Sequence, residues 1–214
     1  AAPDRHVDEH GQARQGMRTE VAAGLRYVLG NRYLRAIAAC TGSANLFSSM
    51  AFATYLVYVV RVLELDPAAI GVVLGLGNIG AVVGAVLAER IGRRAGVGPT
   101  IIVTAALGGV GAILVPIAPI SDPIPFLLLS GVIVGFANVV YNITQVSFRQ
   151  AITPERMQGR MNATMRFIVW GTMPIGSLIG GVLATTMGLH EALWIGTFLG
   201  LFAFLPVLLS PVRM

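Results

Sequence analysis

Six long stretches without a charged residue divide this chain. They occupy residues 36–60, 67–88, 95–121, 123–148, 167–189 and 192–212, and the shortest of them is 21 residues long. About 20 mostly apolar residues are enough for a helix to cross the hydrocarbon layer of a membrane. The pattern therefore predicts an all-α protein with six membrane-spanning helices.

The residues before the first stretch are more polar. We expect residues 1–16 to form a disordered polar linker, because they contain no apolar run. The chain starts without a methionine or an apolar leader, so we expect it to begin inside a longer polypeptide. Residues 17–35 have the pattern of an amphipathic helix at the membrane interface, with apolar residues at helical spacing, namely Val21, Leu25, Val28 and Leu29.

Composition agrees with a membrane protein. The chain is 55% hydrophobic and only 12% charged, which leaves too few polar side chains to cover a soluble globule. The main partner is therefore expected to be the lipid bilayer. The single cysteine, Cys40, lies within the first stretch and cannot form an internal disulfide, so we interpret it as a small core residue.

The arginines predict the orientation of the helices. All fifteen basic residues are arginine, and only Arg61 lies in the loops that follow the first, third and fifth spans. By the positive-inside rule both termini are cytoplasmic. The net charge of +5 could also suggest nucleic acid. The arginines form no stripe along a helix face, however, and we exclude that partner.

One glycine motif has two interpretations. GLGNIG, residues 75–80, matches the glycine pattern of a dinucleotide-binding turn. That turn needs a strand, a loop and a helix within a parallel sheet, whereas this motif lies inside a span-length apolar stretch. We therefore expect no bound cofactor. The glycines at small-xxx-small spacing favour close helix packing instead, and they are Gly71, Gly75, Gly77, Gly80 and Gly84.

Two helix starts can be predicted from residues that precede proline. Asp66 before Pro67 and Thr153 before Pro154 are typical of an N-cap followed by proline in the first turn. They predict the start of the second span and of a short cytoplasmic helix.

Polar residues concentrate on two of the six spans. An amide in hydrocarbon is costly unless it faces other helices or water. The third and sixth spans carry only Thr104 and Thr197 centrally and can face lipid. The first span has a stripe formed by Thr41, Asn45, Ser48, Phe52 and Tyr55. The fourth has a stripe of Gly131, Gly135, Asn138, Asn142, Gln145 and Arg149, with Tyr141 beside it.

We expect the first and fourth spans to line a substrate pathway. The alternative is that their amides only join helices, through hydrogen bonds of roughly 0.6 to 2 kcal/mol. We favour that alternative for Asn78, which is alone on its span. Trp170 is either an interfacial anchor or a pathway residue. The predicted pathway residues are Asn45, Tyr55, Asn138, Tyr141, Asn142, Gln145 and Trp170.

Asp, Glu, Lys, Arg and His are absent from the depth of every stretch. Paired carboxylates, metal ligands and a Ser/His/Asp arrangement therefore cannot form there, and the sequence does not indicate an enzyme. No proton carrier is present within the spans either.

Two loops resemble those of a known family. LAERIGRRAG, residues 87–96, resembles the cytoplasmic loop signature G-x-L-A-D-R-x-G-R-R of the major facilitator superfamily, with Glu89 in place of the Asp and Ala85 in place of the first Gly. ITPERMQGRMNATMRF, residues 152–167, is similar to the loop between the tenth and eleventh helices of bacterial multidrug and siderophore exporters in that superfamily.

The resemblance implies the C-terminal half of a twelve-helix secondary transporter in a bacterial plasma membrane. Residues 36–118 and 124–212 would be two inverted three-helix repeats within one six-helix domain, 36–212. The missing N-terminal half would be its partner, and alternating access would export a small amphipathic molecule. The cytoplasmic loops would act in gating, through Glu89, Arg90, Arg93, Arg94, Arg156 and Arg160. A purely topogenic role for these arginines is the alternative.

Two other readings remain open at this point. A six-helix protein could work alone as a homodimer, because both halves of such transporters share one orientation. It could also be a non-transporting scaffold or an inactive remnant.

Overall fold

The computed structural model describes residues 17–213, which form nine α-helices and a final 3₁₀ turn. The elements are α1 (Met17–Gly30), α2 (Arg32–Arg61), α3 (Pro67–Gly77), α4 (Ile79–Ala95), α5 (Val97–Ile117), α6 (Ile124–Ala151), α7 (Glu155–Thr186), α8 (Leu189–Leu201), α9 (Leu205–Leu208) and η1 (Pro211–Arg213). Residues 1–16, where we predicted a linker, lie outside the described part.

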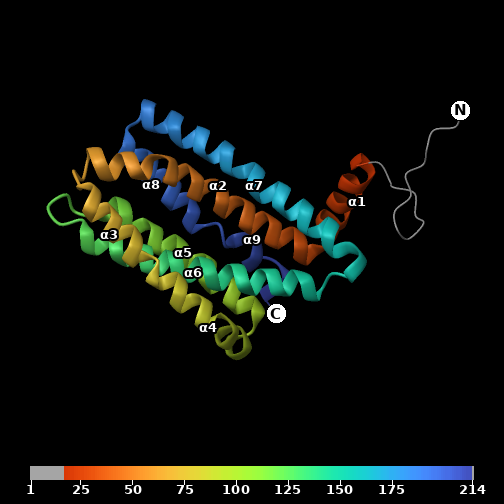
Figure 1. The fold of residues 1–214 in the computed structure, drawn as a ribbon. Coiled ribbons are helices and arrows are strands. Elements are labelled where there is room, and N and C mark those ends of the chain that lie inside the picture. The colour runs from red at the N-terminus through yellow and green to blue at the C-terminus, as the bar shows by residue number, and fades with distance from the viewer. Residues whose placement is uncertain (1–16, 214) are drawn as a thin grey trace, which may run out of the picture.

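Six helical segments are long and apolar enough to cross a membrane, as predicted. They are α2, α3 with α4, α5, α6, α7, and α8 with α9. The second span is interrupted at Asn78, where α3 ends and α4 begins. α1 is short and lies across one end of the bundle (Figure 1). The protein is therefore an integral membrane protein, and every regular element of residues 17–213 is a helix.

Capping residues set where the first two spans begin. The Asn31 side-chain oxygen accepts hydrogen bonds from the backbone N–H groups of Tyr33 and Leu34, at 2.9 and 3.3 Å. This cap divides the predicted amphipathic segment 17–35, because its last residues belong to α2. Asp66 accepts from the N–H of Ala69 at 2.9 Å, which confirms the predicted start of the second span.

The predicted short helix after Thr153 is wrong. α7 begins at Glu155 without a side-chain cap and continues to Thr186 as one helix. The Thr153 hydroxyl, which we expected to cap it, has no hydrogen-bond partner among the described residues. The helix continues because Met161 and Met165 of its early turns are buried against α1 and α2. Tertiary packing thus joins the loop segment to the fifth span.

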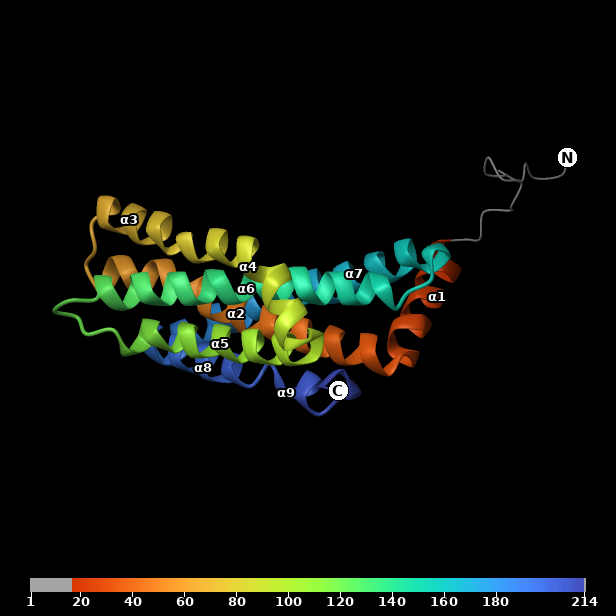
Figure 2. The same ribbon diagram turned by 90° about the horizontal axis from the view of Figure 1, so that it is seen from below.

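The two predicted repeats are interlocked. The second span of each repeat packs on the first span of the other, α4 on α6 and α7 on α2. α5 and α8 lie together along one side of the bundle (Figure 2). Most other helices pack on α2 or α6, which are therefore the central helices. α2 contacts α7 and α8 of the second repeat, and α6 contacts α3, α4 and α5 of the first repeat.

Glycines allow the two crossings between repeats. Gly80 and Gly84 of α4 face α6, and a Cβ on Gly80 would collide with the carbonyl oxygen of Val132. Gly176 and Gly180 of α7 face α2 in the same way, and a Cβ on Gly180 would collide with the carbonyl oxygen of Met50. Both pairs have the four-residue spacing that suits close contact in lipid.

The predicted glycine set divides into two groups. Gly77, Gly80 and Gly84 are buried against α6, and Gly77 lies opposite Gly131. Gly71 and Gly75 have nothing within 4 Å of a built Cβ, so they do not contribute to this contact.

Neighbouring glycines on α7 give a matched test of the crossing. Gly180→Ala should lower the free energy of unfolding by about 1 to 3 kcal/mol, because the new methyl group forces α7 away from α2. Gly181→Ala should be neutral or stabilising by up to about 1 kcal/mol, because that position is open and alanine favours the helix. Unfolding of both variants in a detergent titration measures the difference. Equal effects would contradict the packing described here.

Candidate functional site: a groove between the repeats

A groove of about 560 Å³ lies between α2 and α6. Residues of α3, α5, α7 and α8 also line it. Most of its lining is apolar, with a few amides and hydroxyls, which is the usual composition of a small-molecule site. The polar lining residues are Asn45, Ser48, Ser49, Tyr55, Asn78, Ser130 and Thr197.

The stripe on the first span lies along this groove. Asn45, Ser48, Phe52 and Tyr55 all line it. The rings of Phe52 and Tyr55 are stacked, with centroids 6.4 Å apart. The Asn45 amide donates to the Thr41 carbonyl of its own helix at 2.8 Å, so its nitrogen is held along α2.

The stripe on the fourth span is divided between two environments. Asn138 and Tyr141 line a smaller cavity of about 120 Å³ between α2, α5, α6 and α8. This cavity adjoins the groove, because Ser48 and Thr197 line both. Alanine and glycine make up much of its remaining lining. The two spaces together form a groove with a narrow recess.

Tyr141 joins the two central helices. Its hydroxyl lies 2.7 Å from the Thr41 hydroxyl and donates to the Cys40 sulfur at 3.4 Å. All three side chains are buried, and Cys40 occupies the core position that we expected. The Tyr141 hydroxyl therefore already has partners within this chain, whereas a substrate-binding role was predicted for it.

A buried polar column continues from Tyr141 along α6. Gln145 and Arg149 are 3% and 8% exposed, and Thr153 follows one turn further. The Gln145 Oε1, Arg149 Nε and Thr153 Oγ1 atoms are the buried side-chain atoms without a hydrogen-bond partner among the described residues. Gln145 and Arg149 lie one turn apart on one face of α6, and Thr153 follows in the turn after that helix. The Arg149 Nε atom is buried without an acceptor, which opposes folding.

The remaining pathway residues lie elsewhere. Asn142 is exposed, and neither it nor Gln145 lines the groove or its recess. Trp170 is 62% exposed on α7, with the guanidinium carbon of Arg166 5.1 Å from its ring centroid. Met173, one turn further along α7, lines the groove in its place.

The predicted gating residues form two groups. Glu89 and Arg93, one turn apart near the end of α4, form an exposed ion pair at 2.8 Å. Arg90 and Arg94 are exposed beside them. Arg156 and Arg160 lie instead in the first turns of α7, where Arg156 is exposed and Arg160 borders α1.

Sequence reasoning missed several groove residues. Asn78 was interpreted as a link between helices, but its amide donates to the Leu74 carbonyl of its own span at 2.7 Å and it lines the groove. Ser130 and Thr197 also line it. Ser130 could have been found, because it stands two turns before Asn138 and extends the stripe on the fourth span.

Arg149 gives a stability test with a definite sign. Arg149→Met keeps most of the side-chain volume and removes a buried charge, so it should raise the free energy of unfolding by about 1 to 4 kcal/mol. Arg90→Met, at an exposed position, should stay within about 0.5 kcal/mol of the parent. Both are measured by detergent titration. A marked loss of stability in Arg149→Met would show that the guanidinium has an acceptor.

Comparison with known proteins identifies the family. Residues 5–213 match the model of the Major Facilitator Superfamily. The multidrug efflux pump Tap of Mycolicibacterium fortuitum is 29% identical over an alignment of 223 positions that covers 99% of this chain. Tap of Mycobacterium tuberculosis strain ATCC 25618 / H37Rv is 27% identical over 199 residues, 90% of this chain.

The matches cover only part of those pumps. This chain spans about half the length of the curated relatives, 48% of the first and 44% of the second. Six spans in two interlocked repeats agree with such a half. Because the family model covers nearly every residue, the chain belongs to the Major Facilitator Superfamily of transporters, as its loop at residues 87–96 had indicated.

Proposed function

We propose that this chain is the C-terminal half of an exporter that moves a small amphipathic molecule by alternating access. The groove between α2 and α6 carries the proposal, because it is large enough for a small molecule and lies between the two repeats. The similarity to multidrug efflux pumps supports an export function. Substrate would bind between this half and a second half. The placement of the arginines favours an orientation of the chain with both termini in the cytoplasm.

The lining of the groove favours an uncharged or weakly polar substrate. It contains amides, hydroxyls and the stacked Phe52 and Tyr55 rings, and none of its lining residues carries a formal charge. Aromatic rings offer apolar contact area, and the amides can bind hydroxyl or carbonyl groups. A charged substrate would need an opposite charge from the second half.

Asn45 and Asn138 test the groove. Replacing each by leucine should reduce the export rate by about three- to tenfold per lost hydrogen bond. Thr185→Val is the matched control, because this exposed threonine lines neither the groove nor its recess. Accumulation of a fluorescent amphipathic dye is measured in cells without other drug exporters, which express the native gene product that contains these residues. Unchanged export by both leucine variants, at normal expression, would return the amides to a packing role.

The same assay separates the alternatives to a two-half transporter. Export that requires a second, different six-helix segment agrees with the proposal. Export by this chain alone, with two copies per particle, would favour the homodimer. No export of any dye, with every partner supplied, would favour a scaffold or remnant.

Glu89 and Arg93 test the proposed gate. Their exposed pair contributes only about 0.3 to 0.5 kcal/mol to stability, so Glu89→Gln should leave unfolding nearly unchanged. If the pair biases the two transport states, the variant should slow export about fivefold or more. Glu64→Gln, at an exposed position on the opposite side, is the control. Normal export by Glu89→Gln would favour the topogenic role of this loop.

A further inference from the structure

We propose that the recess beside the groove is a subsite that admits one small substituent of the transported molecule and prefers a hydrogen-bond donor there. This inference rests on the proposed function, because it names which molecules the groove would select. The recess has a volume of about 120 Å³. An apolar cavity of about 150 Å³ holds one benzene molecule, so the recess fits a group of a few heavy atoms and not a whole drug-sized molecule.

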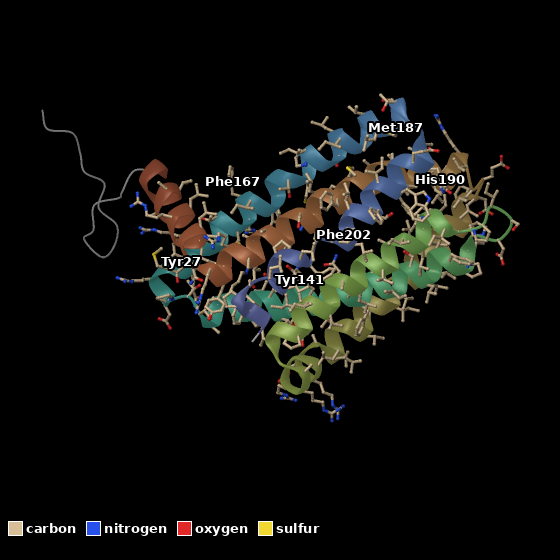
Figure 3. The ribbon with its side chains drawn as sticks, turned by 180° about the vertical axis from the view of Figure 1, so that it is seen from behind. Tyr27, Tyr141, Phe167, Met187, His190 and Phe202 are labelled. Carbon is tan, nitrogen blue, oxygen red and sulfur yellow. The ribbon has the colours of Figure 1, made fainter. Side chains whose placement is uncertain are left out.

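The recess adjoins the groove and extends into the bundle. The residues that line both spaces are Ser48, Ala51, Ala112, Val134 and Thr197. Thr104 and Tyr141 line only the recess, and both are buried. Figure 3 shows Tyr141 near the middle of the molecule, away from the ends of the spans. A molecule bound in the groove could therefore place a side group in the recess without leaving the groove.

Close helix contacts hold the walls of the recess in place. A Cβ on Gly109 would lie 2.6 Å from the Cα of Leu201, so α5 and α8 touch there at the backbone. A Cβ on Gly196 would lie 3.0 Å from the backbone nitrogen of Ala51, so α8 also lies close against α2. Both glycines line the recess. The recess is therefore already formed before a ligand arrives, and binding does not have to open it.

Two other glycines leave the recess open although helix packing does not require them. A Cβ on Gly108 would lie 3.7 Å from the Ala137 Cβ, and both residues line the recess. A Cβ on Gly200 would lie 3.7 Å from the Phe47 Cβ, again between two lining residues. These are ordinary contact distances, so alanine would fit at both positions and would favour the helix. Glycine there keeps room for a substituent of a bound molecule.

The buried hydroxyl groups of the recess have already used their protons. Thr104 and Thr197 each donate to a backbone carbonyl of their own helix, at 2.6 and 2.8 Å. Tyr141 donates to the Cys40 sulfur at 3.4 Å. These oxygens still offer lone pairs, because a hydroxyl can accept hydrogen bonds as well as donate one. The depth of the recess therefore favours a group that donates, such as a hydroxyl, over a carbonyl or a nitrile.

Two polar side chains beside the groove are free to bind the same substituent. Ser48 and Asn138 line the recess and are exposed, and neither side chain forms a hydrogen bond with another residue of the described part. None of the described lining residues is charged. A charged group in such surroundings would have no counterion, so an uncharged donor is favoured over an ammonium group.

Three fluorescent dyes test the subsite. They are diethylaminocoumarins that differ in one ring substituent, which is hydrogen, methyl or hydroxymethyl. The native gene product that contains these residues is purified in detergent, and the dissociation constant of each dye is measured from the change in its fluorescence. We expect the parent to bind the hydroxymethyl dye about three- to tenfold more tightly than the methyl dye, because its hydroxyl gains a hydrogen bond in the recess.

Threonine variants test the hydrogen bonds. Thr104→Val combined with Thr197→Val removes two acceptors at nearly constant volume, so it should reduce the preference for hydroxymethyl over methyl to less than about twofold. Thr185→Val is the matched control, because Thr185 also donates to a carbonyl of its own helix but does not line the recess. It should keep the preference of the parent. Binding of the unsubstituted dye shows that each variant is folded.

Glycine variants test the space. Gly108→Ala combined with Gly200→Ala adds two methyl groups to the lining, so it should weaken binding of the methyl and hydroxymethyl dyes about fivefold. Binding of the unsubstituted dye should stay unchanged, because that dye does not enter the recess. Gly181→Ala, at an open position on α7, is the matched control and should alter none of the three affinities.

The possible failures are distinguishable. Equal binding of the methyl and hydroxymethyl dyes by the parent would overturn the subsite and leave the groove as a binding site. A preference that survives in both double variants would place the substituent elsewhere in the groove and would also overturn the subsite. Absence of binding for all three dyes would contradict the groove itself as a site for uncharged amphipathic molecules, and the subsite with it.

Discussion

Backbone contact at glycine is the constraint on which the rest of this structure depends. In lipid, an apolar side chain gains little by leaving hydrocarbon for another apolar surface, so helices associate through close van der Waals contact. At Gly80 and Gly180 the neighbouring atom is a carbonyl oxygen of another helix, and no side chain fits. Because each contact joins one repeat to the other, the six spans pack as a single unit. The groove lies between α2 and α6, and each of these helices takes part in one of the two crossings.

Polar contacts join the two repeats at two levels of the bundle. Inside the bundle the Tyr141 hydroxyl joins α6 to Thr41 of α2. At one end an imidazole nitrogen of His190 lies 3.0 Å from the Pro116 carbonyl, which joins the last turn of α5 to the first turn of α8. Both contacts connect the first repeat to the second. A movement of one repeat against the other would have to break these two contacts. They therefore favour motions that keep both contacts, namely rocking of the whole half or bending within single helices.

The sequence predicted the spans well because hydrocarbon thickness imposes their length and excludes charge. It predicted the stripe on α2 because helical periodicity alone places Asn45 and Tyr55 on one face. It predicted the stripe on α6 less well. Asn138, Asn142 and Gln145 lie within one narrow arc of that helix, and the border between exposed and buried surface runs through this arc. The rotation of α6 about its own axis decides whether each amide is exposed or buried. That rotation is set by contacts such as Gly131 with Gly77, which link residues far apart in the chain.

The charge distribution limits what this half can contribute to an energy-driven cycle. No acidic residue lies in the six charge-free stretches, and the groove is lined by amides, hydroxyls and aromatic rings. Arg149 is the one buried charged residue among those described, and it stays a cation at every physiological pH and so cannot carry a proton. An acid that takes up and releases a proton during transport must therefore lie outside these spans. In the proposed transporter, this half would supply the shape of the pathway and a switch between states, while the driving force would enter through other residues.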